Sequence, residues 1–397
     1  MLRFNFNIPK SLIFGYIILS GCNGPAEFNN YELSEGQSIE LKLDRFTSPA
    51  ERYSQFHPNW NGKEVFAVHV KDQNVIKIYD LKSGQLEEEL SYATEGPQAI
   101  PSVYYFHLHN EDSIFLSQSH HYKLTLTNKG MEPVNVFNLL PDEVEIDPET
   151  LGPTSENFGI LTADSKRPLT ILENKVIGHL MPFMSPYRTD ASLIDGLFIQ
   201  KGFLDGSMNF KVGYPQEMQG KIWGPMHGLF FSCFNKNNNQ FIMSFAASEN
   251  LQVYDHQLNY LFSSKANASK FKSIRPMSKP DSDPEVYKEY YMNQPVYGGI
   301  YHDVKNDIFY RIGRYPNGDD YDPYKSDYLD PMANPRDLVI IALNKDLNKI
   351  AEHTIKQPQD GVYFDVSFAN ENGLYISFVD FNDEDKLYFK NFKAIKK

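Results

Sequence analysis

The sequence is poor in cysteine and in positive charge. Its 397 residues include only 2 Cys, at positions 22 and 233, so a framework of several disulfides is excluded as the source of stability. Lys and Arg number 38 against 51 Asp and Glu, which gives a formal net charge of −13. Nucleic acid and anionic membrane faces both repel so acidic a chain. We therefore expect no nucleic-acid partner.

The sequence also lacks the short motifs of the common enzyme classes. It contains no H-E-x-x-H zinc motif, no G-x-S-x-G nucleophile elbow, no phosphate-binding glycine loop and no dinucleotide fingerprint. Ser269 and Lys272 match S-x-x-K, but the S-D-N and K-T-G elements that accompany that motif are missing. These absences predict no catalytic residue.

Aromatic residues are abundant, with 29 Phe and 25 Tyr, and such residues favour strands. Residues 101–139 hold one complete unit of a repeat. Strands are expected at 102–109, 113–117, 122–127 and 132–137, and Asn- and Asp-rich turns separate them. Four short antiparallel strands within about 40 residues are typical of a propeller blade.

The same pattern recurs along the chain. Two clear copies begin at His227 and Tyr297, and two weaker copies cover 52–92 and 158–214. The last copy, 363–392, has three strands and lacks its fourth.

A segment near the start of the chain can supply the missing strand. Ser38–Asp44 has the alternating pattern of a half-buried strand, and its pairing with the C-terminal blade would close the ring and cover strand edges. We therefore predict an all-β, six-bladed propeller closed by an N-terminal strand. A pair of stacked β-sandwiches is the alternative.

The N-terminus has the pattern of a targeting segment. Arg3 and Lys10 precede an apolar run at 12–19 that is too short to cross a bilayer. Leu19-Ser-Gly-Cys22 then resembles the lipobox of bacterial lipoproteins. The resemblance implies cleavage before Cys22 and a diacylglycerol anchor on its thiol. An ordinary signal peptide with an incidental cysteine is the alternative.

This interpretation divides the chain into three parts. We predict a lipoprotein signal peptide at 1–21, a flexible tether at 22–37 and a single propeller domain at 38–397. The acyl chains would anchor the protein firmly, because each buried methylene contributes ~0.8 kcal/mol. The predicted location is the outer membrane, on its periplasmic or its surface-exposed face. With Cys22 lipidated, Cys233 is expected to be a buried free thiol.

Loops that lead into the innermost strands of a propeller gather at one mouth of its channel, a common ligand site. In several of these loops Pro stands beside a side-chain amide or a ring, which suggests stiff loops that present polar groups. The candidate ligand-binding residues at the mouth are Gln98, His227, Gln294, Tyr297 and Asp360. The alternative is that Pro and Gly serve turn geometry alone.

Two insertions and a group of histidines offer further candidates. A short helix is predicted within 279–295, whose tyrosines either cover the mouth or dock the helix. An acidic loop within 315–336 offers weak Ca²⁺ ligands at Asp319, Asp320 and Asp322, but a solvated acidic loop is the favoured interpretation, followed by a partner-docking or carbohydrate-stacking surface. Blade 101–139 contains His107, His109, His120 and His121, but their spacing does not require a zinc site.

The lipobox, the Tyr- and Phe-rich blades and the closing 363–373 segment together resemble a family of Gram-negative lipoproteins of unknown function. That family is similar to the six-bladed TolB-like propellers. The resemblance implies a fold and a location, and it carries over no active site. We therefore expect a tethered, non-enzymatic binding or scaffold protein without a required cofactor, with a protein, peptide or glycan partner at the channel mouth. The alternative is a Ca²⁺-dependent hydrolase or lyase with its metal in the channel.

Overall fold

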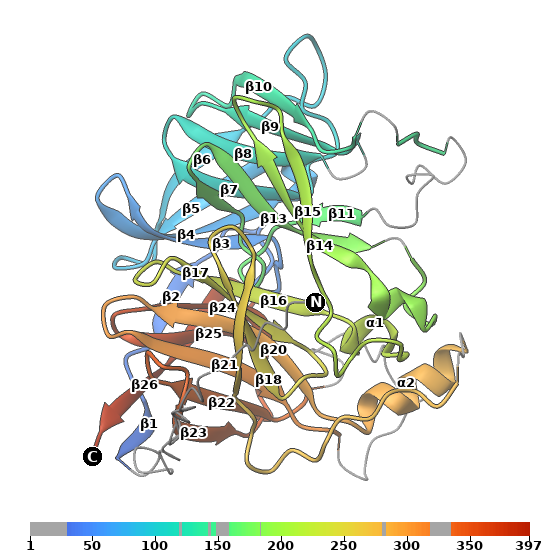
Figure 1. The fold of residues 1–397 in the computed structure, drawn as a ribbon. Coiled ribbons are helices and arrows are strands. Elements are labelled where there is room, and N and C mark those ends of the chain that lie inside the picture. Colours follow the sequence, from blue (N-terminus) through green and yellow to red (C-terminus); the bar gives the residue numbers. More distant parts are fainter. Residues whose placement is uncertain are drawn as a thin grey trace, which may run out of the picture.

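A computed structural model describes residues 30–118, 121–141, 144–147, 159–182, 184–279, 283–317 and 335–397. These residues form six antiparallel sheets arranged as the blades of a propeller (Figure 1). The inner strands of blades 4, 5, 6, 1 and 2 touch in turn, and shared hydrophobic clusters join blade 3 to blades 2 and 4, which completes the ring. The predicted six-bladed fold is therefore confirmed, and the β-sandwich alternative is excluded.

Blades 1 to 3 occupy the first half of the chain, and each is described from its inner to its outer strand. Blade 1 contains β3 (Ser54–Trp60), β4 (Lys63–Val70), β5 (Val75–Asp80) and β6 (Leu86–Ser91). Blade 2 contains β7 (Tyr105–Asn110), β8 (Ser113–Gln118), β9 (Lys123–Thr127) and β10 (Pro133–Asn138). Blade 3 contains β11 (Gly159–Thr162), β12 (Thr170–Leu172), β13 (Lys175–Pro182), β14 (Asp195–Gly202) and β15 (Met208–Gly213).

Blades 4 to 6 complete the ring. Blade 4 contains β16 (Phe230–Asn235), β17 (Gln240–Phe245), β18 (Asn250–Asp255) and β19 (Tyr260–Lys265). Blade 5 contains β20 (Val296–Asp303), β21 (Ile308–Arg314), β22 (Leu338–Leu343) and β23 (Lys349–Ile355). Blade 6 contains β24 (Gly361–Asn370), β25 (Gly373–Asp380) and β26 (Lys386–Lys396), with β1 (Tyr31–Glu35) and β2 (Ile39–Lys42) from the start of the chain.

The ring closes where residues 31–42 meet the last strand of the chain. Strand β2 pairs antiparallel with β26, with Ile39 opposite Phe389, so the predicted closure is confirmed. Strand β1 extends the same pairing, with Tyr31 opposite Lys396 (Figure 1). Residues 31–35 fall in the segment that we predicted to be a flexible tether, so that prediction was wrong for this part of 22–37. The polar residues around Leu33 concealed a strand that buries one side chain.

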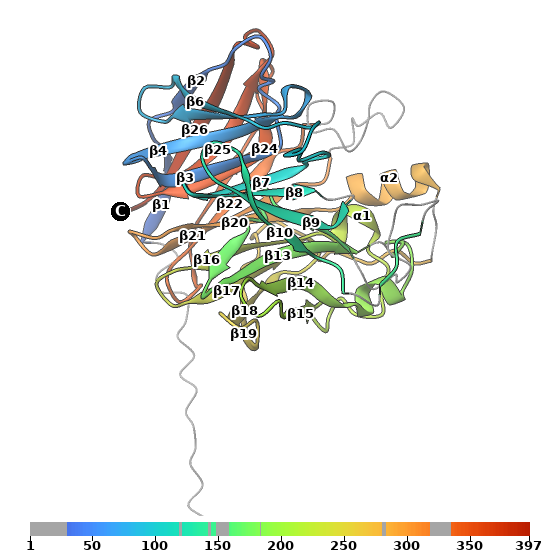
Figure 2. The same cartoon turned by 90° about the horizontal axis from the view of Figure 1, so that it is seen from above.

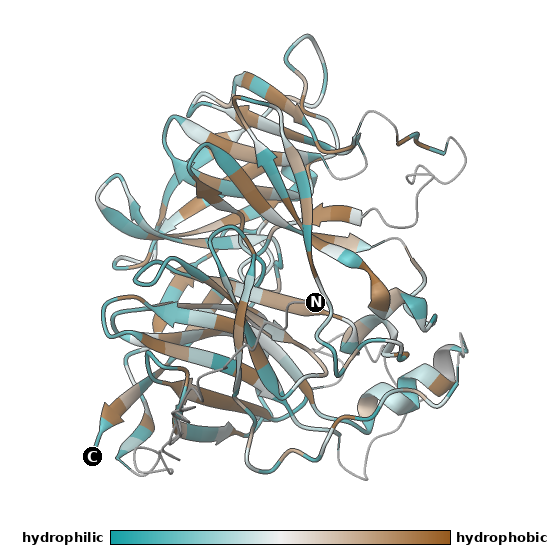
Figure 3. Cartoon of the chain, viewed as in Figure 1, coloured by the Kyte–Doolittle hydropathy of each residue, from teal (hydrophilic) through white to brown (hydrophobic). Residues whose placement is uncertain are grey.

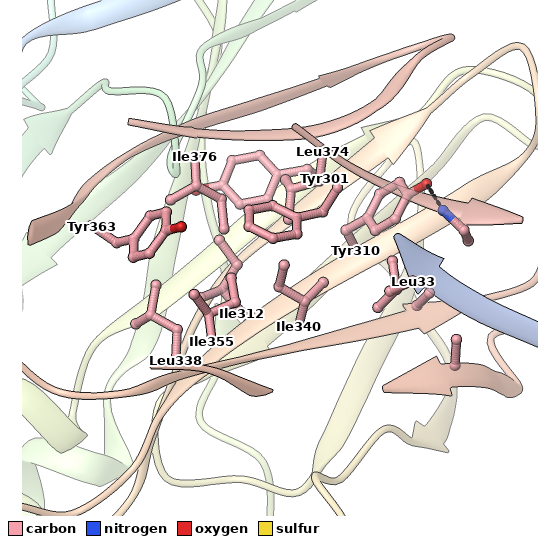
Figure 4. Packing of buried hydrophobic residues seen from close by; sticks show 14 of the residues in the cluster. Leu33, Tyr301, Tyr310, Ile312, Leu338, Ile340, Ile355, Tyr363, Leu374 and Ile376 are labelled. Atoms are coloured by element: carbon pink, nitrogen blue, oxygen red, sulfur yellow. Dashed lines mark hydrogen bonds between the residues drawn. The ribbon is translucent and has the colours of Figure 1, made fainter. Parts of the chain in front are cut away.

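The hydrophobic core lies between neighbouring blades, as in a stack of sheets. Leu33 lies opposite Ala394 on β26 and enters the cluster between blades 5 and 6, near Tyr310 (Figure 4). In the same cluster the hydroxyl of Tyr310 accepts a hydrogen bond from the amide of Ala394 at 3.3 Å (Figure 4). Apolar residues follow the strands through the interior, while the outer hairpins are largely hydrophilic (Figure 3). Each blade is therefore stabilised by burial against its two neighbours.

Helices are short and lie outside the sheets. Among the described residues they are the 3₁₀ helices η1 (Lys71–Gln73) and η3 (Asp190–Leu193) and the α-helices α1 (Gly224–His227) and α2 (Pro284–Met292). Helices α1 and α2 lie side by side at one edge of the ring (Figure 2). Within the described part of the chain, no helix combines the length and the apolar character needed to cross a membrane. The predicted helix within 279–295 is confirmed as α2.

Cys233 lies on the inner strand of blade 4 and is a buried free thiol, as expected. Burial raises the pKa of this thiol well above its ordinary value. The side chain therefore belongs to the core between blades 4 and 5.

Candidate functional site

The inner strand of blade 3 is interrupted by a hairpin at residues 163–169. Strands β11 and β12 both pair with β13, and the hairpin leaves the sheet between them. Asp164 and Arg167 form an isolated antiparallel bridge across its turn. The carboxylate of Asp164 accepts hydrogen bonds from the amides of Lys166 and Arg167 at 2.9 Å, and it pairs with the Arg167 guanidinium. These bonds make a rigid turn that is independent of the ladder.

The hairpin lies on the channel side of the neighbouring blades. The amide of Ser232, on inner strand β16, donates a hydrogen bond to the carbonyl of Lys166 at 3.2 Å. The ammonium of Lys166 lies 5.8 Å from the ring centre of Phe231 on the same strand. Burial raises the pKa of Tyr105 on β7 to about 12, and the charges of Arg167 and Asp164 also act on it. The hairpin therefore extends from blade 3 toward inner strands of blades 2 and 4.

The inner strands of blades 5 and 6 also depart from regular pairing. On β20 the register shifts between Tyr297 and Ile300, so Gly298 and Gly299 form a bulge. A Cβ atom on Gly299 would lie 2.5 Å from the hydroxyl oxygen of Tyr301, so a larger residue here would force the buried Tyr301 side chain to shift. On β24 the register shifts between Tyr363 and Ser367. Bulges of this kind often adjoin functional sites, because they redirect side chains and end regular pairing.

These irregular segments surround one cavity of about 80 Å³. Its lining comes from the hairpin, helices α1 and α2, the inner strands of blades 4 to 6 and adjoining strands of blades 5 and 6. The polar and glycine residues of the lining are Lys166, Gly298, Gly299, Gly313, Arg314, Arg336 and Ser367. Apolar walls are supplied by residues that include Phe231, Tyr291, Tyr297, Tyr301, Leu338 and Phe364. The described lining residues include three basic side chains and no acidic one.

Arg336 is the most constrained of the basic residues. Its side chain is buried, with 3% of its surface exposed. Its Nε donates to the carbonyl of Tyr315 and its Nη2 to the carbonyl of Gln294, both at 2.5 Å. The guanidinium carbon lies 4.9 Å from the ring centre of Tyr291. The third nitrogen, Nη1, is buried without a hydrogen-bond partner.

Ser367 provides a second buried polar group without a partner. It is 1% exposed on β24, and its hydroxyl makes no hydrogen bond. A buried polar atom without a partner is uncommon and costs free energy, because it has lost water without replacing it. Lys166 and Arg314 line the same cavity but are engaged in contacts of their own. The cavity therefore presents two donors that the fold itself leaves unused.

Comparison with known proteins places this geometry in a family. A family model described as a domain of unknown function, DUF4221, matches residues 30–176 and 207–354, which is more than half of the chain. The chain belongs to the DUF4221 family. The predicted resemblance to a six-bladed family of unknown function is thereby confirmed, whereas the lipoprotein anchor stays a prediction. No curated protein matches the chain.

Two solved structures share the fold of this DUF4221 chain. A DUF4221 member from Bacteroides vulgatus superposes with a TM-score of 0.74 at 19% identity, over 93% of this chain and 100% of that one. A candidate exported protein from Bacteroides fragilis superposes with a TM-score of 0.52 at 10% identity, over 94% of this chain and 97% of that one. At these identities the similarity shows the fold alone.

Of the five predicted mouth residues, Tyr297 lines the cavity. It is 1% exposed, and the guanidinium carbon of Arg311 lies 3.8 Å from its ring centre. Its hydroxyl accepts a hydrogen bond from the amide of Ala268 at 3.3 Å. The ring therefore forms a fixed wall of the DUF4221 cavity.

His227 and Gln294 lie close to the cavity but hold the structure together. The Nε2 atom of His227 lies 3.1 Å from the carbonyl oxygen of Pro295, and burial lowers the pKa of this imidazole to about 3. The side-chain amide of Gln294 accepts from the amide of Arg275 at 2.6 Å and donates to its carbonyl at 3.1 Å. Both side chains fasten the entry to blade 5.

Gln98 and Asp360 are exposed and are not brought to the cavity. Gln98 lines a separate surface pocket over blade 2, with Gln118 and Lys123. The main chain of Asp360 accepts a hydrogen bond from the amide of Phe381 at 3.0 Å. Their role as ligand contacts stays a prediction. Cys22, Asp319, Asp320 and Asp322 lie outside the described residues.

The tyrosines of α2 dock the helix onto blade 4. The hydroxyl of Tyr287 accepts a hydrogen bond from the amide of Met226 at 2.8 Å. A Cβ atom on Gly224 would lie 2.2 Å from the Tyr287 ring, so α1 and α2 meet in close contact. Tyr291 contributes to the cavity wall. Of the two interpretations of this helix, docking explains the buried tyrosines.

One buried serine–histidine pair has the hydrogen bond of a hydrolase site, but a substrate has no access to it. The hydroxyl of Ser232 lies 2.9 Å from Nε2 of His179, but both residues are at most 2% exposed. His179 Nδ1 has no orienting partner, and burial lowers the pKa of His179 to about 3. A substrate cannot reach this serine, and a third group that would hold the imidazole is missing. The pair packs blade 3 against blade 4.

A second group of histidines lies on the inner strands of blades 1 and 2. His57 Nε2 lies 3.2 Å from the carbonyl oxygen of His109, and the rings of His107 and His109 are 6.2 Å apart. Burial lowers the pKa values of all three, and the positive charge of Lys236 adds to this effect. Within the described residues, no three His, Cys, Asp or Glu side chains are arranged to hold a metal ion. His120 lies outside the described residues.

Sequence reasoning missed Lys166, Arg314, Arg336 and Ser367. A tandem glycine inside a predicted strand is a known indication of a bulge, and Gly298–Gly299 provided it. The other residues meet only in the folded ring, and nothing local in the sequence links them.

Proposed function

We propose that this DUF4221 protein is an exported, non-enzymatic binding protein that is tethered to the outer membrane through Cys22. It takes a ligand, or a protruding group of a protein, peptide or glycan partner, into the cavity between hairpin 163–169 and blades 4 to 6. The observation that carries the proposal is the convergence of three irregular inner segments on one cavity whose buried polar groups are not all satisfied.

Export and anchoring rest on the N-terminus. Its charge, apolar run and lipobox follow in the order of a lipoprotein signal, and a structure with the same fold belongs to a candidate exported protein. Substitution Cys22→Ser is expected to move the protein from the membrane fraction to the soluble fraction. Continued membrane fractionation of this variant would refute the lipid anchor.

Binding can be tested by closing the cavity with a single side chain. Gly298 lines the cavity, and a Cβ atom there would meet its nearest neighbour, Ile312 O, at an ordinary 3.5 Å. Gly298→Val should therefore fold and reduce the free volume. Gly196→Val is the matched control, because a Cβ atom on Gly196 also has its nearest contact at 3.5 Å, at Phe210 on blade 3.

The full chain and both variants would be screened against peptide and glycan arrays and a library of small metabolites. The proposal expects ligands that bind the wild type and Gly196→Val and that Gly298→Val loses. Ligands that bind all three chains equally would place the site elsewhere. A complete absence of ligands would overturn the proposed function.

A further inference from the structure

The cavity has the chemistry of an anion site, and this inference rests on the proposed function. We propose that the group it takes is an oxyanion, a carboxylate, phosphate or sulfate, held by Nη1 of Arg336 and the hydroxyl of Ser367. Both atoms are buried, both lack a partner, and both residues line the same cavity.

Arg336 is oriented for this role by the rest of the fold. Two of its nitrogens are fixed on the carbonyls of Tyr315 and Gln294, so rotation of the guanidinium would break two hydrogen bonds. Burial lowers the pKa of Arg336, but a guanidinium in a protein remains charged. A buried charge without a counter-charge is costly, and a bound anion would offset that cost. The remaining nitrogen is therefore held ready for an anion.

The surroundings favour negative charge and exclude a bound cation. Lys166 and Arg314 add positive charge to the lining, and the described lining residues include no carboxylate. The hydroxyl of Ser367 donates one further hydrogen bond to an oxygen that Arg336 holds. Charge-assisted hydrogen bonds of this kind are the stronger class.

The size of the cavity limits the group that enters. The cavity measures about 80 Å³. A carboxylate, phosphate or sulfate group fits this space. A larger ligand would place only its anionic group here.

The test uses the full chain purified in detergent, titrated with sodium phosphate, sulfate or acetate against sodium chloride of equal ionic strength. The melting temperature and calorimetric affinity are measured. We expect at least one oxyanion to raise the melting temperature in proportion to ln(1 + [L]/Kd) while chloride does not. The three salts distinguish a phosphate or sulfate site from a carboxylate site. Equal effects of all salts, chloride included, would overturn the assignment.

Substitution Ser367→Ala separates ligand binding from packing. Removal of a buried hydroxyl without a partner should leave the free protein at least as stable as the wild type, because an unpaired polar group disappears. Its loss from an ion-binding site should weaken the oxyanion affinity about ten- to hundredfold, the effect of one hydrogen bond to a charged group. Unchanged affinity in this variant would overturn the role of Ser367.

Ser377→Ala is the matched control. Ser377 on β25 is also fully buried with an unpartnered hydroxyl, but it does not line the cavity. The Ser377→Ala variant should be as stable as Ser367→Ala and should bind oxyanions as tightly as the wild type. Arg336→Lys should lose most of the oxyanion affinity, and Ser367→Ala keeps the test decisive if the lysine variant does not fold. One outcome separates this inference from the proposed function. If library ligands bind the wild type but not Gly298→Val, and no oxyanion changes the melting temperature, the anion assignment is refuted and the proposed function stands.

Discussion

Replacement of Arg311 on β21 should lower the free energy of unfolding more than most single substitutions, although its side chain has no contact with solvent. It is fully buried between blades 4 and 5. Its guanidinium donates five hydrogen bonds, to one hydroxyl and four main-chain carbonyls: Ser244 Oγ, and the carbonyl oxygens of Phe245, Ser248, Glu249 and Ala266. The ring of Tyr297 covers its face at 3.8 Å. Arg311→Met keeps much of the volume and removes the entire network.

The expected loss of stability depends on which acceptor carbonyls keep another hydrogen-bond donor after Arg311 is replaced. The carbonyls of Phe245 and Glu249 also accept main-chain amides, from Ser248 and Ala266 respectively. For the carbonyls of Ser248 and Ala266, Arg311 supplies the donor at 2.7 and 3.0 Å. Each buried carbonyl left unpaired costs about 1–3 kcal/mol, so we expect a loss of ~3–5 kcal/mol in the free energy of unfolding.

Chemical denaturation followed by tryptophan fluorescence measures this loss. With an unfolding entropy of ~2.1 cal/mol/K per residue and roughly 330 residues that the structure describes, the melting temperature should fall by ~4–7 °C. Arg311→Lys should recover only part of the loss, because an ammonium has three donors and no planar face. Arg275→Met, at an exposed position, is the control. A loss below ~1 kcal/mol in Arg311→Met would refute the reasoning.

Three further predictions follow from the fold. Leu33→Ala, on β1, should lower the free energy of unfolding by ~2–4 kcal/mol. The control Leu204→Ala, at a residue 85% exposed, should not lower it. Equal free energies of unfolding for the two variants would show that β1 does not close the ring. The folded pKa values of the buried His69 and His179, about 4 and 3, lie below the ordinary 6.5, so stability should be complete above pH 6.5 and fall by ~2 kcal/mol for each histidine by pH 5. The melting temperature measured from pH 7 to pH 5 checks this prediction. His179→Gln should reduce its pH dependence, whereas the control His256→Gln should not. A wild-type melting temperature that stays constant from pH 7 to pH 5 would contradict the prediction. EDTA should leave the melting temperature unchanged, and a clear drop would favour Ca²⁺ at Asp319, Asp320 or Asp322.

The blades were predictable because their information is local. In β9 the alternation of apolar and polar side chains predicts a strand, although both faces of β9 and of β18 are largely buried, and turns at 128–130 and 235–239 limit where neighbouring strands begin and end. The closing strand β2 carried the same pattern. Strand β1 did not, because one buried leucine among polar residues is too little pattern to distinguish a strand from a tether.

The cavity was not predictable because its parts are distant in the chain. Lys166, Gly298, Arg336 and Ser367 come from a hairpin, a bulge, a loop and a second bulge, and their proximity depends on how the blades pack. His227 shows the opposite error. Its loop leads into inner strand β16, but tyrosines of α2 pack against its ring, and the docking of a helix cannot be predicted from the loop itself.

Two buried arginines of blade 5 show how structure separates packing from binding. Arg311 and Arg336 are both almost inaccessible, and both lie against a tyrosine ring. All three nitrogens of Arg311 are bonded to the protein, so the fold consumes its full capacity. Arg336 uses two nitrogens and keeps the third for the cavity. Because a buried donor without a partner lowers stability, its retention at the wall of a cavity is best explained by a ligand that completes it.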